Sequence, residues 1–160
     1  MGSMKIDKSS YLVRAATATH RQEWARLRYA LWPDCSEERH ALETQELIKP
    51  SNGGVVLVAV RDGHSLCGFM EISLRRDHVE GTSAIPVPYL EGWYVEPAER
   101  GHGLGRKLLQ AAETWALNHG FTEIASDAEF ENEIGIQAHL ASGFKETCRT
   151  VHFVKSIVRT

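Results

Sequence analysis

The 160-residue chain lacks the features that mark several large classes of protein. It contains no apolar run of about 18 residues, the length that a membrane-spanning helix requires, and its N-terminus has no signal-peptide pattern. Positive charge is not in excess, because 18 Lys and Arg residues stand against 21 Asp and Glu residues, for a net charge of −3. Phosphate contacts need a surplus of Lys and Arg, so we expect no nucleic-acid partner. Because the apolar run is missing, we expect no membrane partner either.

Cysteine is scarce and scattered. Cys35, Cys67 and Cys148 form no C-x-x-C pair, so we expect neither a zinc site nor a disulfide framework, and no metal cofactor. None of the three thiols has a neighbouring group that would activate it as a nucleophile. Isolated thiols are typical of a reducing compartment, so we expect a cytoplasmic protein.

The composition is that of one packed domain. Apolar residues make up 42% and charged residues 24%, which is too apolar for disorder. The length suits one ordinary domain, and no repeat, low-complexity tract or linker divides the chain. We expect a single domain over residues 1–160, in which residues 1–3 are a cloning remnant before a natural start at Met4.

The hydrophobic patterns predict a mixed α/β order of elements. A capping pair of Thr19 and Gln22 predicts a first helix that Pro33 stops, and Asp62-Gly63 predicts a hairpin turn. Strands are expected over residues 11–15, 55–61, 65–75, 89–95, 123–126, 145–149 and 151–157. Further helices are expected over residues 36–49, 104–119 and 132–142, and a long loop over residues 76–88.

A glycine-rich turn between a strand and a helix is the most informative segment. Three glycines in five positions, Gly101, Gly103 and Gly105, let the backbone approach a ligand closely, and the N–H groups that begin the helix attract an anion. The segment does not fit a Walker A loop, and the dinucleotide pattern G-x-G-x-x-G fails at Arg106. The alternative is a tight turn that binds nothing.

The turn does fit R-x-x-G-x-G, with Arg100, Gly103 and Gly105, and it resembles the pyrophosphate-binding signature of the GCN5-related N-acetyltransferase (GNAT) superfamily. The resemblance extends to Asn132, which opens the next helix, and to Gly143-Phe144, which close it. It implies an α/β GNAT fold, with a mixed central sheet whose parallel strands splay apart and are flanked by helices, and acetyl-CoA as co-substrate. The cofactor-binding residues implied are Trp93, Tyr94, Val95, Arg100, Gly101, His102, Gly103, Leu104, Gly105, Arg106 and Asn132.

Four further segments look like the aminoglycoside 6′-N-acetyltransferases of the chromosomal, dimer-forming type. They are Leu31-Trp32-Pro33-Asp34, residues 75–81, Pro86-x-x-x-Leu90-Glu91-Gly92 and Ala125-Ser126-Asp127, and Phe144-Lys145-Glu146-Thr147 extends the match. The resemblance implies that Trp32, His78, Glu91 and Asp127 line an aminoglycoside pocket and that the enzyme confers antibiotic resistance. It also implies a homodimer that exchanges its C-terminal strands, here residues 145–157.

The sequence departs from that group at three positions. Relatives generally have Tyr at the position of His78, an acidic residue at that of Cys148, and a small residue or proline at that of Phe130. The charge pattern agrees with a cationic acceptor, because no Lys or Arg occurs between Lys107 and Lys145 while six carboxylates do. Such a run forms either an acidic rim beside the cleft or an ordinary solvated face.

The implied chemistry needs a neutral amine, because an amine with a pKa of about 10.4 is almost wholly protonated at pH 7. Asp127 is the candidate base, or else an electrostatic anchor for the ammonium. The backbone N–H of Val95 is the candidate donor to the developing oxyanion. His139 stands where many relatives have a tyrosine, and it either protonates the leaving thiolate or only packs on its helix.

Two alternatives remain open from the sequence. One is a GNAT enzyme that acetylates another amine, such as a polyamine, a peptide or a protein lysine. The other is a non-catalytic acyl-CoA-binding regulator, which the carboxylates Glu91 and Asp127 argue against.

Overall fold

The structure is a computed structural model that describes residues 11–61 and 65–157. The chain divides into two compact units, one up to Asp127 and one from Ala128 onward, and each is described by itself. The single domain expected from the sequence therefore remains a prediction.

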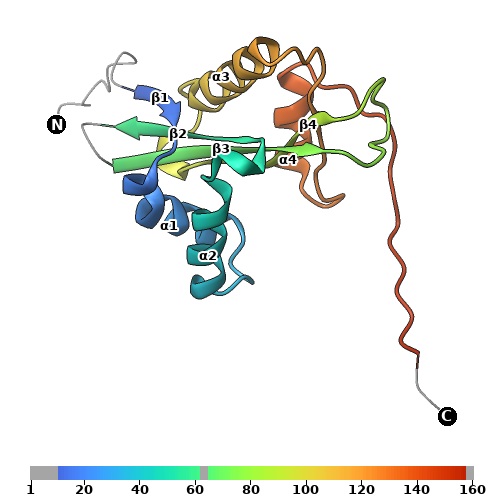
Figure 1. Ribbon diagram of the computed structural model, residues 1–160, viewed down its shortest axis with the longest axis horizontal. Helices are drawn as coiled ribbons and strands as arrows, with labels where there is room; N and C mark the ends of the chain where they lie inside the picture. Colours follow the sequence, from blue (N-terminus) through green and yellow to red (C-terminus); the bar gives the residue numbers. More distant parts are fainter. Residues whose placement is uncertain (1–10, 62–64, 158–160) are drawn as a thin grey trace. The chain divides into compact units, whose positions relative to one another are not determined.

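The first unit is built on a five-stranded mixed sheet (Figure 1). Its strands follow one another in sequence order, and neighbours from β1 to β4 are antiparallel, whereas β5 runs parallel to β4. The strands are β1 (Tyr11–Ala15), β2 (Val55–Arg61), β3 (Ser65–Arg75), β4 (Val87–Val95) and β5 (Ala125–Ser126). The predicted mixed sheet is confirmed, while the predicted Asp62-Gly63 turn lies outside the described residues.

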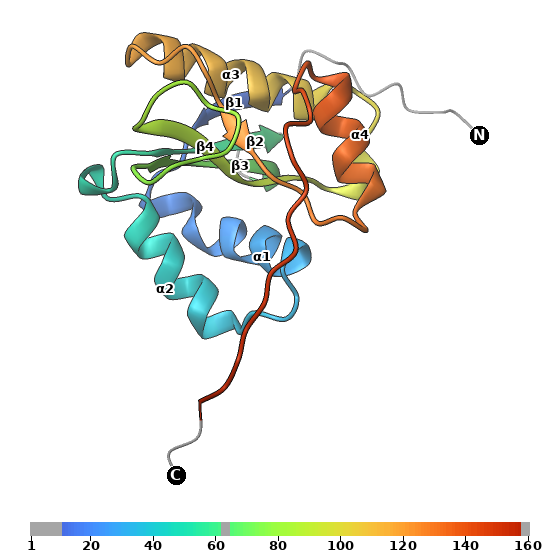
Figure 2. The same ribbon diagram turned by 90° about the vertical axis from the view of Figure 1, so that its right-hand side faces the viewer.

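Helices cover both faces of this sheet (Figures 1 and 2). On one side lie α1 (Arg21–Leu31) and α2 (Glu37–Leu47), and on the other lies α3 (Leu104–Asn118). Trp24 and Leu27 of α1 pack in one cluster with Val58 and Phe69 of the sheet. Because both faces are covered, β2 is apolar on successive residues rather than alternately.

The helix ends are set by local side chains, and one predicted cap is wrong. A 3₁₀ turn (Ala18–His20) precedes α1, and the backbone N–H of Thr17 donates to His20 Nδ1 at 2.9 Å, so Thr17 rather than Thr19 begins the helical segment. Ser36, where the second helix was expected to begin, caps α2 by accepting the N–H of Arg39. α1 ends before Pro33, as expected for a residue that cannot continue a helix.

The strand β4 begins at Val87, two residues earlier than predicted, and includes Pro88. β4 pairs with β5 only at Tyr89 and Leu90. Pro88 has no N–H to donate toward that edge, and no residue of β5 pairs with Pro88 there, so the sheet loses no hydrogen bond.

A β-bulge interrupts β4. Glu71 of β3 pairs with Gly92 and the next residue, Ile72, pairs with Leu90, so Glu91 is an extra residue on β4. The bulge places two consecutive residues, Glu91 and Gly92, on the same face of the sheet. This is the face that α1 covers, and it also carries Tyr89 and Tyr94. This bulge is the feature around which the candidate site is arranged.

The second unit contains α4 (Glu133–Ala141), and Asn132 caps it by accepting the N–H of Gly135 at 2.9 Å. Residues 145–157 contain no helix or strand, so the two predicted terminal β segments are wrong for the single chain. A strand needs a neighbour to pair with, and side chains here are largely exposed, with exposed fractions of 92% at Phe153 and 98% at Val154.

Candidate active site

The glycine turn leaves open space in front of a helix N-terminus. Gly101 and Gly103 adopt positive φ of 79° and 81°, a region that favours glycine, and a Cβ added at either would meet no atom within 4 Å. Gly103 directly precedes α3, whose first N–H groups have no helical acceptor. The turn can therefore take a negatively charged group against backbone N–H donors, with exposed Arg106 and Lys107 beside it.

Gly105 has a different role from its two neighbours. It lies inside the first turn of α3, and a Cβ there would come within 3.3 Å of Trp93 Nε1 on β4. Its missing side chain lets α3 approach the strand, so the third glycine serves packing between the turn and the strand that leads into it.

A buried carboxylate holds the turn from behind. Glu99 is 1% exposed and accepts hydrogen bonds from the Tyr11 hydroxyl on β1 and the Arg61 guanidinium on β2. The hydrogen bond from Tyr11 lowers the pKa of Glu99; burial opposes this shift, and Arg61 reinforces it. The same bond is the main cause that raises the pKa of Tyr11 to about 12. Sequence reasoning missed Glu99, whose only signal was its place directly before the turn.

The outer edge of β4 presents backbone groups where β5 has diverged. The N–H of Glu96 donates to Cys67 O at 2.9 Å, and bonded and non-bonded pairs alternate along an antiparallel ladder. The N–H and C=O groups of Val95 and Trp93 therefore point away from β3. Arg100 Nε donates to Val95 O at 2.8 Å, which agrees with that direction. By the same alternation the backbone of Tyr94 faces β3, while its ring packs on Phe69.

Three charged or polar groups meet at the bulge on the side of α1. Arg75 donates to both carboxylate oxygens of Glu91, at 3.0 and 2.8 Å, and Ser73 Oγ donates to the same group at 2.6 Å. Burial would raise the pKa of Glu91, but the hydrogen bonds from Arg75 and Ser73 outweigh burial and lower it. Glu91 is therefore ionised and already paired within the chain.

Asp127 joins this cluster through Tyr89. Tyr89 pairs in register with Ala125, two residues before Asp127, so both side chains lie on one face. Burial and a hydrogen bond with the Asp127 carboxylate raise the pKa of Tyr89, so its hydroxyl stays a donor. The Arg75 guanidinium carbon lies 3.4 Å from the centre of the Tyr89 ring. Asp127 itself is exposed.

Tyr89 and Arg75 were not among the predicted site residues. The signal that could have found them is the i, i+2 spacing of Ser73 with Arg75 and of Tyr89 with Glu91 on adjacent strands, which puts all four on one face. The register that brings them opposite each other depends on the bulge and could not be read from the sequence.

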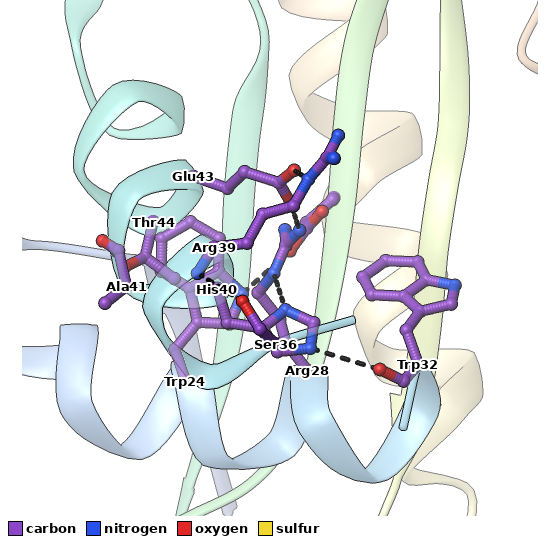
Figure 3. A network of polar contacts seen from close by, with 10 residues as sticks. Trp24, Arg28, Trp32, Ser36, Arg39, His40, Ala41, Glu43 and Thr44 are labelled. Atoms are coloured by element: carbon purple, nitrogen blue, oxygen red, sulfur yellow. Dashed lines mark hydrogen bonds and ion pairs between the residues drawn. The ribbon is translucent and has the colours of Figure 1, made fainter. Parts of the chain in front are cut away.

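Trp32 lies where α1 ends, with its ring against β4 (Figure 3). A Cβ at Gly92 would lie 2.6 Å from Trp32 Cη2, so only glycine leaves room for the indole beside the bulge. The structure thus brings three predicted regions to β4: Trp32, the Glu91–Asp127 cluster, and the Trp93–Val95 edge.

The remaining predicted residues lie elsewhere. His78 is 78% exposed in the loop after β3, with Nε2 3.2 Å from Glu80. In the second unit, His139 Nδ1 lies 2.7 Å from the carbonyl of Gly135, and its ring packs edge-on against Phe144.

Neither a metal site nor a membrane span emerges from the part of the chain that is described. No three His, Cys, Asp or Glu side chains of residues 11–61 and 65–157 are grouped to hold a metal ion. Among the same residues, no helix is long and apolar enough to cross a membrane.

The model of the acetyltransferase (GNAT) family matches residues 18–144, which include the turn, the bulge and α4. The chain belongs to this family, and its five-stranded open sheet flanked by helices is the GNAT fold.

Within the family, the chain is similar to enzymes named aminoglycoside N(6′)-acetyltransferase type 1. It is 43% identical to that of Stenotrophomonas maltophilia over 91% of this chain and 93% of the relative, and 39% identical to that of Klebsiella aerogenes over 93% and 99%. Among solved structures, aminoglycoside N-acetyltransferase AAC(6′)-Iy in complex with CoA superposes with a TM-score of 0.85 at 34% identity, over 92% of this chain and 95% of that one. The resemblance expected from the motifs is confirmed.

Proposed function

We propose that the protein is an acetyl-CoA-dependent N-acetyltransferase that acetylates the 6′-amine of aminoglycoside antibiotics and thereby confers resistance to them. The observation that carries the proposal is the similarity to the type 1 enzymes, which spans the glycine turn and the carboxylate cluster together. AAC(6′)-Iy, whose structure superposes on this chain, has also been solved with the bisubstrate analogue CoA-S-monomethyl-acetylneamine.

The residues of the turn suit a CoA pyrophosphate. The open space at Gly101 and Gly103, the N-terminus of α3 and the nearby Arg and Lys residues favour a bound anion. Beside the turn, the outward backbone groups of Trp93 and the outward carbonyl of Val95 can pair with the amide groups of pantetheine. Acetyl-CoA bound there would supply the thioester, and the N–H of Val95 would donate to the carbonyl oxygen on which negative charge develops.

Asp127 accepts the proton of the attacking amine. The Tyr89 hydroxyl donates to the carboxylate of Asp127, whereas Arg75 and Ser73 both donate to Glu91, so Glu91 is already held by two groups of the chain. In this proposal the amine attacks the thioester directly. Burial raises the pKa of the Cys67 thiol to about 11, which makes Cys67 a poor nucleophile. His139 stays a candidate acid for the departing thiol, although its contacts with Gly135 and Phe144 favour a packing role.

We place the enzyme in the cytoplasm as a homodimer. The apolar side chains of residues 145–157 are exposed in the single chain, and a strand partner from a second copy would bury them. Light scattering at micromolar concentration tests this arrangement, and a monomer would reject it.

The test of function is an acceptor screen that follows CoA thiol release. Kanamycin A, which has a 6′-amine, is expected to turn over. An aminoglycoside with a hydroxyl at 6′ lacks the nucleophile and is expected to inhibit at most. Spermidine and peptides serve as competing acceptors.

Each contrary outcome would overturn a different part of the proposed function. Turnover with spermidine or a peptide, but with no aminoglycoside, would replace the acceptor. Acetyl-CoA binding without turnover of any amine would support a regulator. An acetyl group located by NMR on another amine of kanamycin A would refute the regiochemistry alone.

A further inference from the structure

A buried ionic network lies between α1, α2 and β3. Arg28 and Glu71 are 4% and 5% exposed, and Arg28 Nη1 donates to Glu71 Oε1 at 2.6 Å. Trp24 Nε1 donates to the same oxygen at 2.9 Å, and Arg28 Nη2 pairs with Glu43 of α2. Burying two charges costs enough desolvation energy that an apolar pair of similar size often stabilises a fold equally well. Stability alone therefore gives no reason for this pair.

The network continues to the backbone of Trp32 through His40. Arg28 Nε donates to His40 Nδ1 at 3.3 Å, and His40 Nε2 lies 3.1 Å from the carbonyl oxygen of Trp32 (Figure 3). Because Nδ1 accepts a hydrogen bond, the ring proton is assigned to Nε2, which donates to that carbonyl. His40 is 1% exposed, so water does not compete for either nitrogen.

The same arginine contacts the indole of Trp32. The guanidinium carbon of Arg28 lies 4.8 Å from the centre of the Trp32 ring, within the range of a cation–π contact. The ring lies against Gly92, and Gly92 pairs in register with Glu71, the residue that anchors Arg28. Carbonyl and ring of Trp32 are thus both fixed from one buried anchor beside the bulge.

We propose that Arg28 and His40, held by Glu71, are positioning residues that fix the indole of Trp32 as the acceptor-side wall of the active site. The inference deepens the proposed function and rests on it, since it takes Trp32 to contact the aminoglycoside. Arg28 and His40 themselves act only through Trp32.

The kinetic test compares two substitutions of His40. His40→Leu removes both hydrogen bonds and is expected to raise the acceptor KM about fivefold to tenfold, with kcat and the acetyl-CoA KM unchanged. His40→Gln is expected to restore the acceptor KM, because its amide can accept from Arg28 and donate to Trp32. Thr44→Val is the matched control: Thr44 is 0% exposed on the same helix, and its hydroxyl donates to the Ala41 carbonyl.

A second readout does not need activity. The chain has four tryptophans, which can be labelled with 5-fluorotryptophan, and Trp32→Phe identifies the Trp32 signal in the fluorine NMR spectrum. That signal is expected to shift or broaden in His40→Leu, to return in His40→Gln and to stay unchanged in Thr44→Val. If His40→Leu does not fold, Arg28→Lys keeps the charge beside Glu71 but loses the planar contact with Trp32, and the same changes are expected.

The two readouts separate the two proposals. A folded variant with an unmoved Trp32 signal, or with a moved signal and an unchanged acceptor KM, would overturn the positioning role. If the wild-type protein acetylated no aminoglycoside, the proposed function would fail, while a moved signal would still support the orientation of Trp32 by this network.

Discussion

The proposed cofactor and acceptor sites beside β4 are built from different kinds of chemical group. At the outer edge of β4 and the start of α3, the proposed cofactor site consists of backbone groups: open glycines, the N-terminus of a helix, and the outward N–H and C=O groups of Trp93 and Val95. On the side of α1, the proposed acceptor site consists of side chains, which are held by ion pairs with other side chains.

This difference matters for how each site can vary. Backbone groups lose little conformational freedom on binding and depend on the fold alone, which suits a ligand that never changes. Charged and aromatic side chains carry the choice of acceptor, but they must be held in place by partners such as Arg75, Tyr89 and Arg28 to be specific.

The substitution Asp127→Asn breaks the acceptor side with the largest effect. It keeps the shape of the side chain but removes the base, so kcat is expected to fall about 100-fold or more while acetyl-CoA affinity is kept. Tyr89→Phe, which removes only the partner of Asp127, is expected to lower kcat a few-fold. A kcat that holds in Asp127→Asn, with only the acceptor KM raised, would make Asp127 an electrostatic anchor instead of the base.

The substitution Gly103→Val breaks the cofactor side. The new side chain would be strained at a φ of 81° and would fill the open space, so the Kd for acetyl-CoA is expected to rise about tenfold or more. Gly120→Val is the control, because Gly120 has a φ of 83° and equally open space at the far end of α3. Calorimetry that finds equal cofactor affinity in both variants would reject the turn as the pyrophosphate site.

Salt is expected to change the acceptor KM by a smaller amount than these substitutions change kcat or the Kd for acetyl-CoA. If exposed carboxylates hold several ammonium groups, the acceptor KM is expected to rise a few-fold between about 0.05 M and about 0.5 M salt, because exposed attraction is screened. The rise should be steeper for aminoglycosides with more amines. An acceptor KM that does not respond to salt would show that charge contributes little to acceptor binding.

The smallest effect concerns the carboxylate behind the turn. The pKa of Glu99 is lowered in the folded protein, so its ionised form contributes stability above the ordinary value of 4.5, and this contribution is lost as the pH falls through the folded pKa. Wild type is therefore expected to melt a few degrees above Glu99→Gln at pH 7, with the gap closing in acid. A gap of equal size at pH 7 and at about pH 3 would contradict this linkage.

The glycine turn and the elements around it could be predicted from the sequence, whereas the partners of Glu91 and Asp127 could not. Glycine spacing is local, so the turn at Arg100–Gly105 and the strand before it could be predicted together. The pairing of Arg75 with Glu91 depends on strand register and on a bulge, neither of which leaves a local pattern. The terminal segments were predicted as strands from their apolar residues, but a strand forms only where another lies beside it, and the single chain offers none to the described residues 145–157.

The bulge at Glu91 also makes this part of the gene sensitive to length. Removing Glu91 would restore regular alternation and leave Trp93 and Tyr94 on their present faces, but Ser73 and Arg75 would lose the carboxylate that they hold. One extra residue directly after Gly92 would instead turn the following residues over, so that Trp93 would face α1 and α3 would lose its close approach at Gly105. Inherited variation that alters drug range is therefore expected as substitutions within β4, while insertions and deletions collect in the loop of residues 76–86.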